Sequence, residues 1–285
     1  MLNNKNYYLC KGYEAKAIQK QIIYFHIPKC AGTTLTNILA HLFLWSSKSY
    51  IRIKNQNFEK NKKEILEKNY DFVYGHIPYN ITNYFPNRYS ITILRDPVKR
   101  IISHINHEIN RGNIPNVGLE ECLEKKLIPL NLMTKIFSNR GEMYNNDFQL
   151  NDDILNQAIY TLENKIDLVS DTDNTVETLN FLISVFKFPN VLFQWTQQSK
   201  MQHVTADNNY DLISFYNSYD LNLYKYAKKN IFKKFNKIPI NRDHDNYLLF
   251  NDELRINDKK NIFFFKEQLV QIKKEIEKNN RKIIE

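Results

Sequence analysis

Basic and hydroxyl side chains cluster around a glycine in one short segment of the chain. Residues 26–34 read HIPKCAGTT, so Lys29 precedes Gly32 by three residues and Thr33 and Thr34 follow directly. Where such a loop leads into a helix, its backbone N–H groups and the helix dipole attract an anion, and a lysine adds a point charge. We therefore expect a phosphate or phosphosulfate here, although an ordinary turn with a surface lysine would read the same.

The segment does not have the spacing of a Walker loop. That pattern requires Gly-x4-Gly-Lys-Ser/Thr, whereas here Lys29 comes before Gly32 and the first glycine is missing. The sequence therefore predicts a phosphate site without the usual Mg²⁺-nucleotide geometry.

Two further segments carry residues suited to anion binding and proton transfer. Arg95 opens the segment RDPVKRIIS, in which Ser103 lies six residues after Pro97. A guanidinium can bind a phosphate through paired hydrogen bonds, but Arg95 could equally pair with an acidic neighbour while Ser103 only packs. His76 follows Gly75 and is a candidate general base, because an unperturbed imidazole has a pKa of about 6.5; a lone histidine is more often a surface or core residue.

Alternating strands and helices would position these residues. Apolar runs predict strands, and helical spacing with capping residues predicts helices, among them the one that Asp96 and Pro97 begin and that runs to Gly112. We expect Thr33 or Thr34 to cap the helix that reads TTLTNILAHLFLW. The predicted strands are 21–26, 70–74, 89–94, 166–170 and 190–193, and the other predicted helices are 58–68, 172–186, 221–235 and 262–284.

This alternation indicates an α/β protein with a P-loop-like, three-layer fold. Its central, mainly parallel sheet would be flanked by helices, with irregular helical structure over 118–149 and a helical C-terminal part over 220–285. Ligands bind beyond the carboxyl ends of such strands, and Lys29, His76 and Arg95 all follow predicted strands. We expect the three side chains to meet at one edge of the sheet.

No Pro-, Gly- or Ser-rich linker interrupts the chain, which predicts a single domain over 1–285. Residues 1–19 would form an N-terminal extension, and the helical tail from about residue 242 has no role that the sequence defines.

The formal net charge of +9 favours an anionic partner. Much of the excess lies in the last third of the chain, where solvated helix faces explain it better than a nucleic-acid site does. The three cysteines lack metal-ligand spacing, and no apolar run reaches the roughly 18 residues of a membrane span. The chain is therefore expected to be soluble and cytoplasmic, without metal or nucleic acid, although a chain trimmed of an anchor would look the same.

Three motifs together resemble those of the sulfotransferases that use 3′-phosphoadenosine 5′-phosphosulfate (PAPS). Residues 26–35 (HIPKCAGTTL) resemble their 5′-phosphosulfate loop and 92–104 (TILRDPVKRIISH) their 3′-phosphate motif, while 74–79 (YGHIPY) resemble the segment with the catalytic histidine. The resemblance is strongest to bacterial members of the carbohydrate branch related to heparan sulfate 2-O-sulfotransferase. A weaker match covers 131–138 (NLMTKIFS).

The resemblance implies a role for each residue. Lys29 and His76 would be catalytic, with His76 removing the acceptor's hydroxyl proton, while Arg95 and Ser103 would hold the 3′-phosphate. The acceptor would be a saccharide hydroxyl, and no metal is implied. The expected donor contacts are Lys29, Ala31, Gly32, Thr33, Thr34, Arg95 and Ser103.

Two other functions remain open at this point. A P-loop kinase of a sugar or small metabolite would share the architecture and the phosphate loop. A non-enzymatic protein that binds an anionic glycan would share the fold. Among the other histidines, His26 is expected in the core, and His104 is a further candidate for a ligand contact because it follows Ser103.

Overall fold

The computed structural model describes residues 7–10, 14–46, 48–54, 62–63, 65–140, 143–188, 190–194, 203–205, 209–232 and 247–250. The chain divides into two compact units. The large unit comprises Gln19–Thr178 and Gln197–Asn236, and the small unit comprises Met1–Ile18, Leu179–Thr196 and Lys237–Glu285. A single domain over the whole chain stays a prediction.

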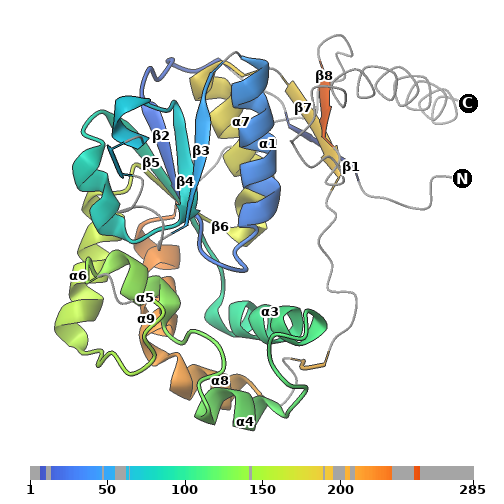
Figure 1. Ribbon diagram of the computed structural model, residues 1–285, viewed down its shortest axis with the longest axis vertical. Helices are drawn as coiled ribbons and strands as arrows, with labels where there is room; N and C mark the ends of the chain where they lie inside the picture. Colours follow the sequence, from blue (N-terminus) through green and yellow to red (C-terminus); the bar gives the residue numbers. More distant parts are fainter. Residues whose placement is uncertain are drawn as a thin grey trace, which may run out of the picture. The chain divides into compact units, whose positions relative to one another are not determined.

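A five-stranded parallel sheet forms the centre of the large unit (Figure 1). Its strand order is β3-β4-β2-β5-β6, and every neighbouring pair is parallel. The α/β prediction with a mainly parallel sheet is therefore confirmed. The strands are β2 (Gln21–Phe25), β3 (Tyr50–Lys54), β4 (Phe72–His76), β5 (Arg88–Leu94) and β6 (Leu168–Asp171).

Helices cover both faces of this sheet because its central strands are apolar on both faces. On one face, α1 (Gly32–Trp45) packs against β3 and β4, and the ring of Phe43 stacks on Phe72 with centroids 5.1 Å apart. On the other face, Ile23, Phe25 and Val73 are fully buried in one hydrophobic cluster. Three helices contribute to that cluster: α5 (Leu132–Phe137), α6 (Asp152–Asn164) and α9 (Ser218–Asn230).

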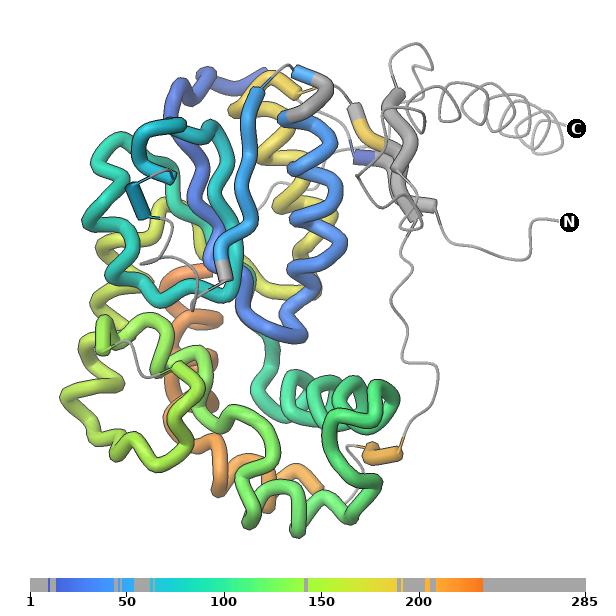
Figure 2. The backbone as a smooth tube through the Cα atoms, viewed as in Figure 1, coloured from blue at the N-terminus to red at the C-terminus, as the bar shows by residue number. Residues whose placement is uncertain are grey.

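A second hydrophobic cluster joins α3 (Pro97–Asn110), α4 (Leu119–Glu124) and α8 (Tyr210–Tyr216). In the tube view, segments distant in the sequence lie side by side here, and α8 packs against both α3 and α4 (Figure 2). Asn106 also fixes a distant segment, because its Oδ1 accepts from the backbone N–H groups of His203 at 2.7 Å and Val204 at 3.0 Å. The cluster thereby anchors α3, the helix that follows the carboxyl end of β5.

The start of α5 is held by a carboxylate from α9. The buried Asp220 accepts hydrogen bonds from the backbone N–H groups of Met133 at 3.1 Å and Thr134 at 2.8 Å, and from the Thr134 hydroxyl at 2.9 Å. A carboxylate at a helix N-terminus both satisfies orphan donors and complements the helix dipole. The segment 131–138 that the sequence singled out therefore contains a helix capped from the distant α9.

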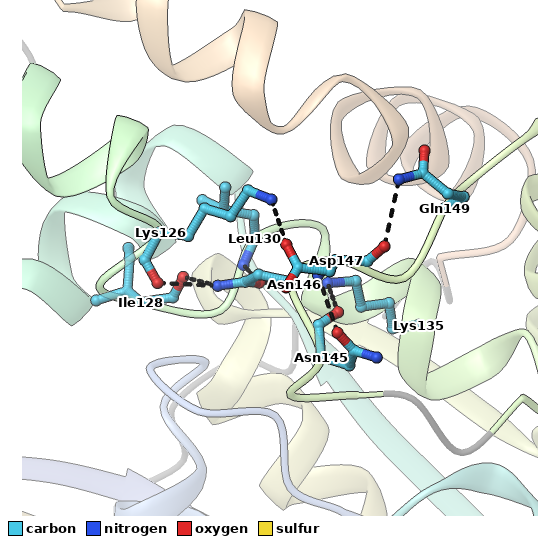
Figure 3. A network of polar contacts seen from close by, with 8 residues as sticks. All are labelled: Lys126, Ile128, Leu130, Lys135, Asn145, Asn146, Asp147 and Gln149. Atoms are coloured by element: carbon cyan, nitrogen blue, oxygen red, sulfur yellow. Dashed lines mark hydrogen bonds and ion pairs between the residues drawn. The ribbon is translucent and has the colours of Figure 1, made fainter.

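Figure 3 shows a further polar network that includes Lys135 of α5. The ammonium of the buried Lys135 donates to the Asn145 carbonyl at 2.8 Å and to Asn146 Oδ1 at 3.3 Å. The amide of Asn146 donates in turn to the carbonyls of Lys126 at 3.1 Å and Ile128 at 2.8 Å. Burial lowers the pKa of Lys135 to about 8. We assign this network to the support of the loop after α5.

The small unit contains a sheet of its own, in the order β1-β7-β8. Its strands are β1 (Tyr7–Cys10), β7 (Asn190–Gln194) and β8 (Tyr247–Phe250), with β1 antiparallel and β8 parallel to β7. Helix α7 (Thr175–Phe186) begins in the large unit and continues into the small one.

Several differences from the sequence-based expectations concern these two sheets. The predicted strand 190–193 is β7 of the small sheet, and β8 interrupts the region predicted as mainly helical, because the apolar YLLF segment pairs with β7. The predicted N-terminal extension contains β1. The sequence did not predict β3, an edge strand.

Two predicted helices fall partly or wholly on residues that the structure does not describe. Of the predicted helix 58–68, residues 62–63 and 65–67 are helical, while 58–61 and 64 lie outside the described residues. The predicted helix 262–284 also lies outside them.

The predicted cap of α1 is wrong. The helix begins at Gly32, so Thr33 and Thr34 lie within its first turn, and Ala31 takes the N-cap position, with its carbonyl accepting from Leu35 N–H at 3.4 Å. Within the described residues, no helix is long and apolar enough to cross a bilayer.

Gly75 offers a test of the β3–β4 pairing. A Cβ at this position would lie 1.8 Å from the Ile53 carbonyl oxygen, whereas a Cβ at Gly118 would have nothing within 4 Å. We expect Gly75→Ala to lower the free energy of unfolding by roughly 1–3 kcal/mol or more through overpacking. Gly118→Ala, the control, replaces the N-cap glycine of α4 and should cost no more than about 1 kcal/mol. Urea titration measures both, and equal midpoints for the two variants would contradict the close approach.

Candidate functional site

The loop between β2 and α1 has a strained backbone. Lys29 and Ala31 have positive φ angles of 69° and 55°, although neither is a glycine. Such conformations are costly outside glycine and persist where the surrounding structure imposes them, often at binding sites. Because α1 starts at Gly32, the N–H groups from Ala31 to Thr34 have no acceptor within the helix. The loop therefore presents backbone donors that have no intrahelical acceptor at the positive end of α1.

Gly32 is required by a contact rather than by its φ angle. A Cβ at this position would lie 1.8 Å from Cδ2 of His26. The His26 ring is buried, as predicted for a core residue, and lies parallel to Tyr24 with centroids 5.9 Å apart. Its other neighbour is His76, whose ring meets it edge to face at 4.7 Å. His26 therefore separates the first turn of α1 from the candidate base.

Arg95 binds the loop directly. Its Nη1 donates to the carbonyl oxygen of Lys29 at 2.9 Å, which joins the carboxyl ends of β5 and β2. Ser103, two turns into α3, is half-buried. Asp96 accepts from Lys99 N–H at 3.0 Å and Pro97 opens the helix, so the predicted start of α3 is confirmed.

The charges around Lys29 favour an anion. Burial, and then the positive charge of Arg95, lowers the pKa of the Lys29 ammonium, and Arg111 contributes in the same direction. Glu108 opposes this effect. A bound anion would relieve the repulsion between Lys29 and Arg95 and would accept the donors of the loop.

His76 is held in its neutral form near pH 7. Burial, and then the positive charge of Arg52, lowers its pKa to about 4. The neighbouring His26 has its pKa lowered to about 3, by burial first and then by His76, Arg52 and Lys29. A neutral imidazole keeps a lone pair that can accept a proton, so near pH 7 His76 is in the protonation state that a general base requires.

Sequence reasoning missed several charged residues at this site. Arg52 lies on β3, next to the strand that carries His76, and lowers the pKa of that histidine. Glu108 lies on α3 and Arg111 directly follows that helix, and both shift the pKa of Lys29. The signal for β3 was present as the alternation of Ile51 and Ile53 with polar residues. That β3 pairs with β4, and so brings Arg52 to His76, depends on a sheet register that the sequence does not display.

His104 is buried, and charged groups face it on both sides. Its Nδ1 lies 3.5 Å from Nη1 of Arg100, and its Nε2 lies 3.8 Å from Oε1 of Glu108. Burial, followed by the charges of Arg100 and Lys29, lowers its pKa to about 3. Glu108 also lies 3.9 Å from His107 Nε2. His104 thus lies between the buried Arg100 and Glu108, the carboxylate that raises the pKa of Lys29.

Within the described part of the chain, no three His, Cys, Asp or Glu side chains gather where they could hold a metal ion.

Two buried histidines make the stability of the protein depend on pH. His26 and His104 have pKa values of about 3 in the folded protein, against about 6.5 in the unfolded chain. Below pH 6.5 the unfolded chain therefore binds protons that the folded protein does not, and the free energy of unfolding should fall by up to about 1.4 kcal/mol per pH unit for each histidine.

Urea titrations between pH 7 and pH 4 measure this slope. His26→Gln and His104→Gln should each reduce it. His107→Gln, at a half-exposed position of the same helix as His104, is the control and should change it less. A slope that neither buried substitution alters would show that these histidines are not held neutral by the fold.

One comparison with known protein families gives a match. Residues 17–151 match the sequence model of the Sulfotransferase family. The matched stretch contains the β2–α1 loop, His76, Arg95 and Ser103. No curated protein matches the chain. Over residues 17–151 the chain carries the sequence pattern of the Sulfotransferase family, which supports sulfuryl transfer as its general activity.

Proposed function

We propose that the chain transfers a sulfuryl group from PAPS to a hydroxyl of a saccharide acceptor. The observation that carries the proposal is the convergence of Lys29, His76 and Arg95 at the carboxyl ends of three neighbouring strands, β2, β4 and β5. This edge is where open parallel sheets bind ligands. The family match supports the reaction type, and the resemblance of the three motifs to carbohydrate sulfotransferases supports the donor and the acceptor class.

The residues present suit a donor with two separate anionic ends. Lys29 and the N–H groups of residues 31–34, with the hydroxyls of Thr33 and Thr34, would hold the 5′-phosphosulfate. Arg95 and Ser103 would hold the 3′-phosphate, the group that distinguishes this donor from ATP. When bound, the donor would supply a sulfuryl group whose bond to the phosphate oxygen breaks as the acceptor oxygen forms a new one.

Lys29 would stabilise the charge that develops on the leaving phosphate. The backbone of Lys29 has a positive φ angle and its carbonyl accepts a hydrogen bond from Arg95, so the residue that carries the ammonium is held in place before the reaction. Preorganised charge of this kind is commonly the largest contribution to catalysis in transfer reactions.

His76 would accept the proton of the acceptor hydroxyl. The low pKa of its imidazole keeps the nitrogen lone pair available, and contact with His26 restricts the ring. The proton acceptor therefore comes from β4, while Lys29 comes from the loop that follows the neighbouring β2.

The identity of the donor can be tested by binding measurements. Titration calorimetry with 3′-phosphoadenosine 5′-phosphate should show tight binding that does not require Mg²⁺, and ATP should bind weakly. Lys29→Ala should weaken bisphosphate binding roughly 10- to 100-fold, the range for a lost charge-assisted hydrogen bond. Lys229→Ala, at an exposed position of α9, is the matched control. Absence of bisphosphate binding, or a clear preference for Mg²⁺-ATP, would favour a kinase instead.

A second prediction concerns the base. His76→Ala should reduce sulfuryl transfer about 10²–10⁴-fold while leaving bisphosphate affinity unchanged, because general-base catalysis contributes that factor. His41→Ala, which alters a half-buried histidine of α1, is the control. In the wild type, the rate should stay level from pH 8 to about pH 5 and fall as the pH approaches the His76 pKa of about 4. Near-wild-type turnover in His76→Ala would refute the assignment.

A further inference from the structure

Arg52 lies on the edge strand next to the strand of the candidate base. In the β3–β4 register, Arg52 is paired with Tyr74 and Lys54 with His76. Paired residues, and residues two apart along a strand, project from the same face, so Arg52 and His76 share a face of the sheet. One strand spacing and one two-residue repeat separate them, which places their Cα atoms roughly 8 Å apart.

The Arg52 side chain is exposed, and no hydrogen bond or ion pair joins it to any residue within the described ranges. Its two aromatic neighbours on the same face are half-buried: Tyr50 precedes it on β3, and Tyr74 lies opposite on β4, with ring centroids 6.3 Å apart. The charge of Arg52 nevertheless reaches the site, because it contributes to the lowered pKa of both His76 and His26. Arg52 therefore lies on the same face of the sheet as the candidate base, next to two tyrosines whose rings are tilted relative to each other.

The strand order decides which substrate could reach Arg52. The proposed donor contacts follow β2 and β5, whereas Arg52 lies on β3, on the far side of β4 from both. Two strand spacings of about 4.8 Å separate β3 from β2, and three separate it from β5. The proposed donor lies over β2 and β5, and the proposed base lies on β4. A substrate group that binds Arg52 on β3 therefore belongs to the acceptor.

We propose that Arg52 is a specificity-determining residue that binds an anionic substituent of the acceptor saccharide and thereby directs the reacting hydroxyl toward His76. This inference rests on the proposed function. A guanidinium binds a carboxylate or a sulfate ester through two parallel hydrogen bonds, which fixes orientation as well as distance. The acceptor is therefore an already acidic saccharide rather than a neutral one.

An exposed charge on an edge strand also has a purely protective explanation, since it prevents edge-to-edge pairing of sheets. A protective arginine would affect self-association of the protein, and it would not affect the choice between two saccharides that differ only in charge. The experiment therefore compares saccharides, not stability.

The test uses the full chain saturated with 3′-phosphoadenosine 5′-phosphate. Calorimetry measures its affinity for an oligosaccharide that contains glucuronic acid, for the same oligosaccharide after carboxyl reduction, and for a neutral galactose oligosaccharide with and without a sulfate ester. We expect at least one anionic member to bind on the order of tenfold more tightly than its neutral counterpart. The pair that shows the difference identifies carboxylate or sulfate as the recognised group.

Three variants assign that preference to Arg52. Arg52→Gln should abolish it, Arg52→Lys should restore part of it, and Arg140→Gln, at another exposed arginine, should leave it unchanged. All three should keep wild-type affinity for the bisphosphate. Turnover with the preferred acceptor should show a raised KM in Arg52→Gln with a smaller change in kcat.

The outcomes separate the two proposals. If the wild type does not bind the bisphosphate, the proposed function itself is wrong. If the bisphosphate binds but charged and neutral saccharides bind equally or not at all, or if Arg52→Gln keeps the preference, the inference about Arg52 is overturned and the donor assignment stands.

Discussion

The hydrogen bond from Arg95 to the carbonyl of Lys29 joins the two strand ends on which the site depends. It fixes a lysine with positive φ at the end of β2 by a guanidinium at the end of β5. Two cations are thereby held together against their mutual repulsion, and the surrounding fold has to supply the free energy that keeps them there. The second hydrophobic cluster, which joins α3, α4 and α8, contributes to this by anchoring α3, the helix that begins two residues after Arg95.

A second constraint comes from the packing of His26. Its ring occupies the space that a side chain at position 32 would need, and its edge meets His76. The same residue therefore selects glycine at the start of α1 and limits the movement of the candidate base. Because all of these contacts are buried or half-buried, neutral imidazoles are favoured throughout, and the positive charge of the site is concentrated on lysine and arginine.

Local signals predicted the parts of the site that lie within single segments. The apolar run of β2, the turn at Gly32 and the Asp96-Pro97 start of α3 each depend on neighbouring residues, and each appears in the sequence as a recognisable pattern. The cap of α1 was predicted wrongly because the helix already begins at Gly32, one residue before Thr33. Whether Ser103 contacts a donor remains a prediction.

Features that depend on pairing between distant segments were not predictable in this way. The position of Arg52 beside His76 follows from the register of β3 with β4, and β3 itself is short and carries charges as edge strands do. The small sheet pairs three strands that lie far apart in the sequence, β1, β7 and β8, so no local pattern predicts their pairing. The parallel sheet of the large unit was predictable because alternating strands and helices leave few other topologies.

The carboxylate of Asp220 at the start of α5 bears on how the large unit is assembled during synthesis. The acceptor of the Thr134 N–H group, Asp220, is synthesised 86 residues later. Strand β6 and helix α9, which complete the sheet and its hydrophobic cluster, also follow residue 151. The stretch that carries the family pattern is thus shorter than the unit that can fold, and a nascent chain released at its boundary would expose both an uncapped helix and an unpaired edge of β5.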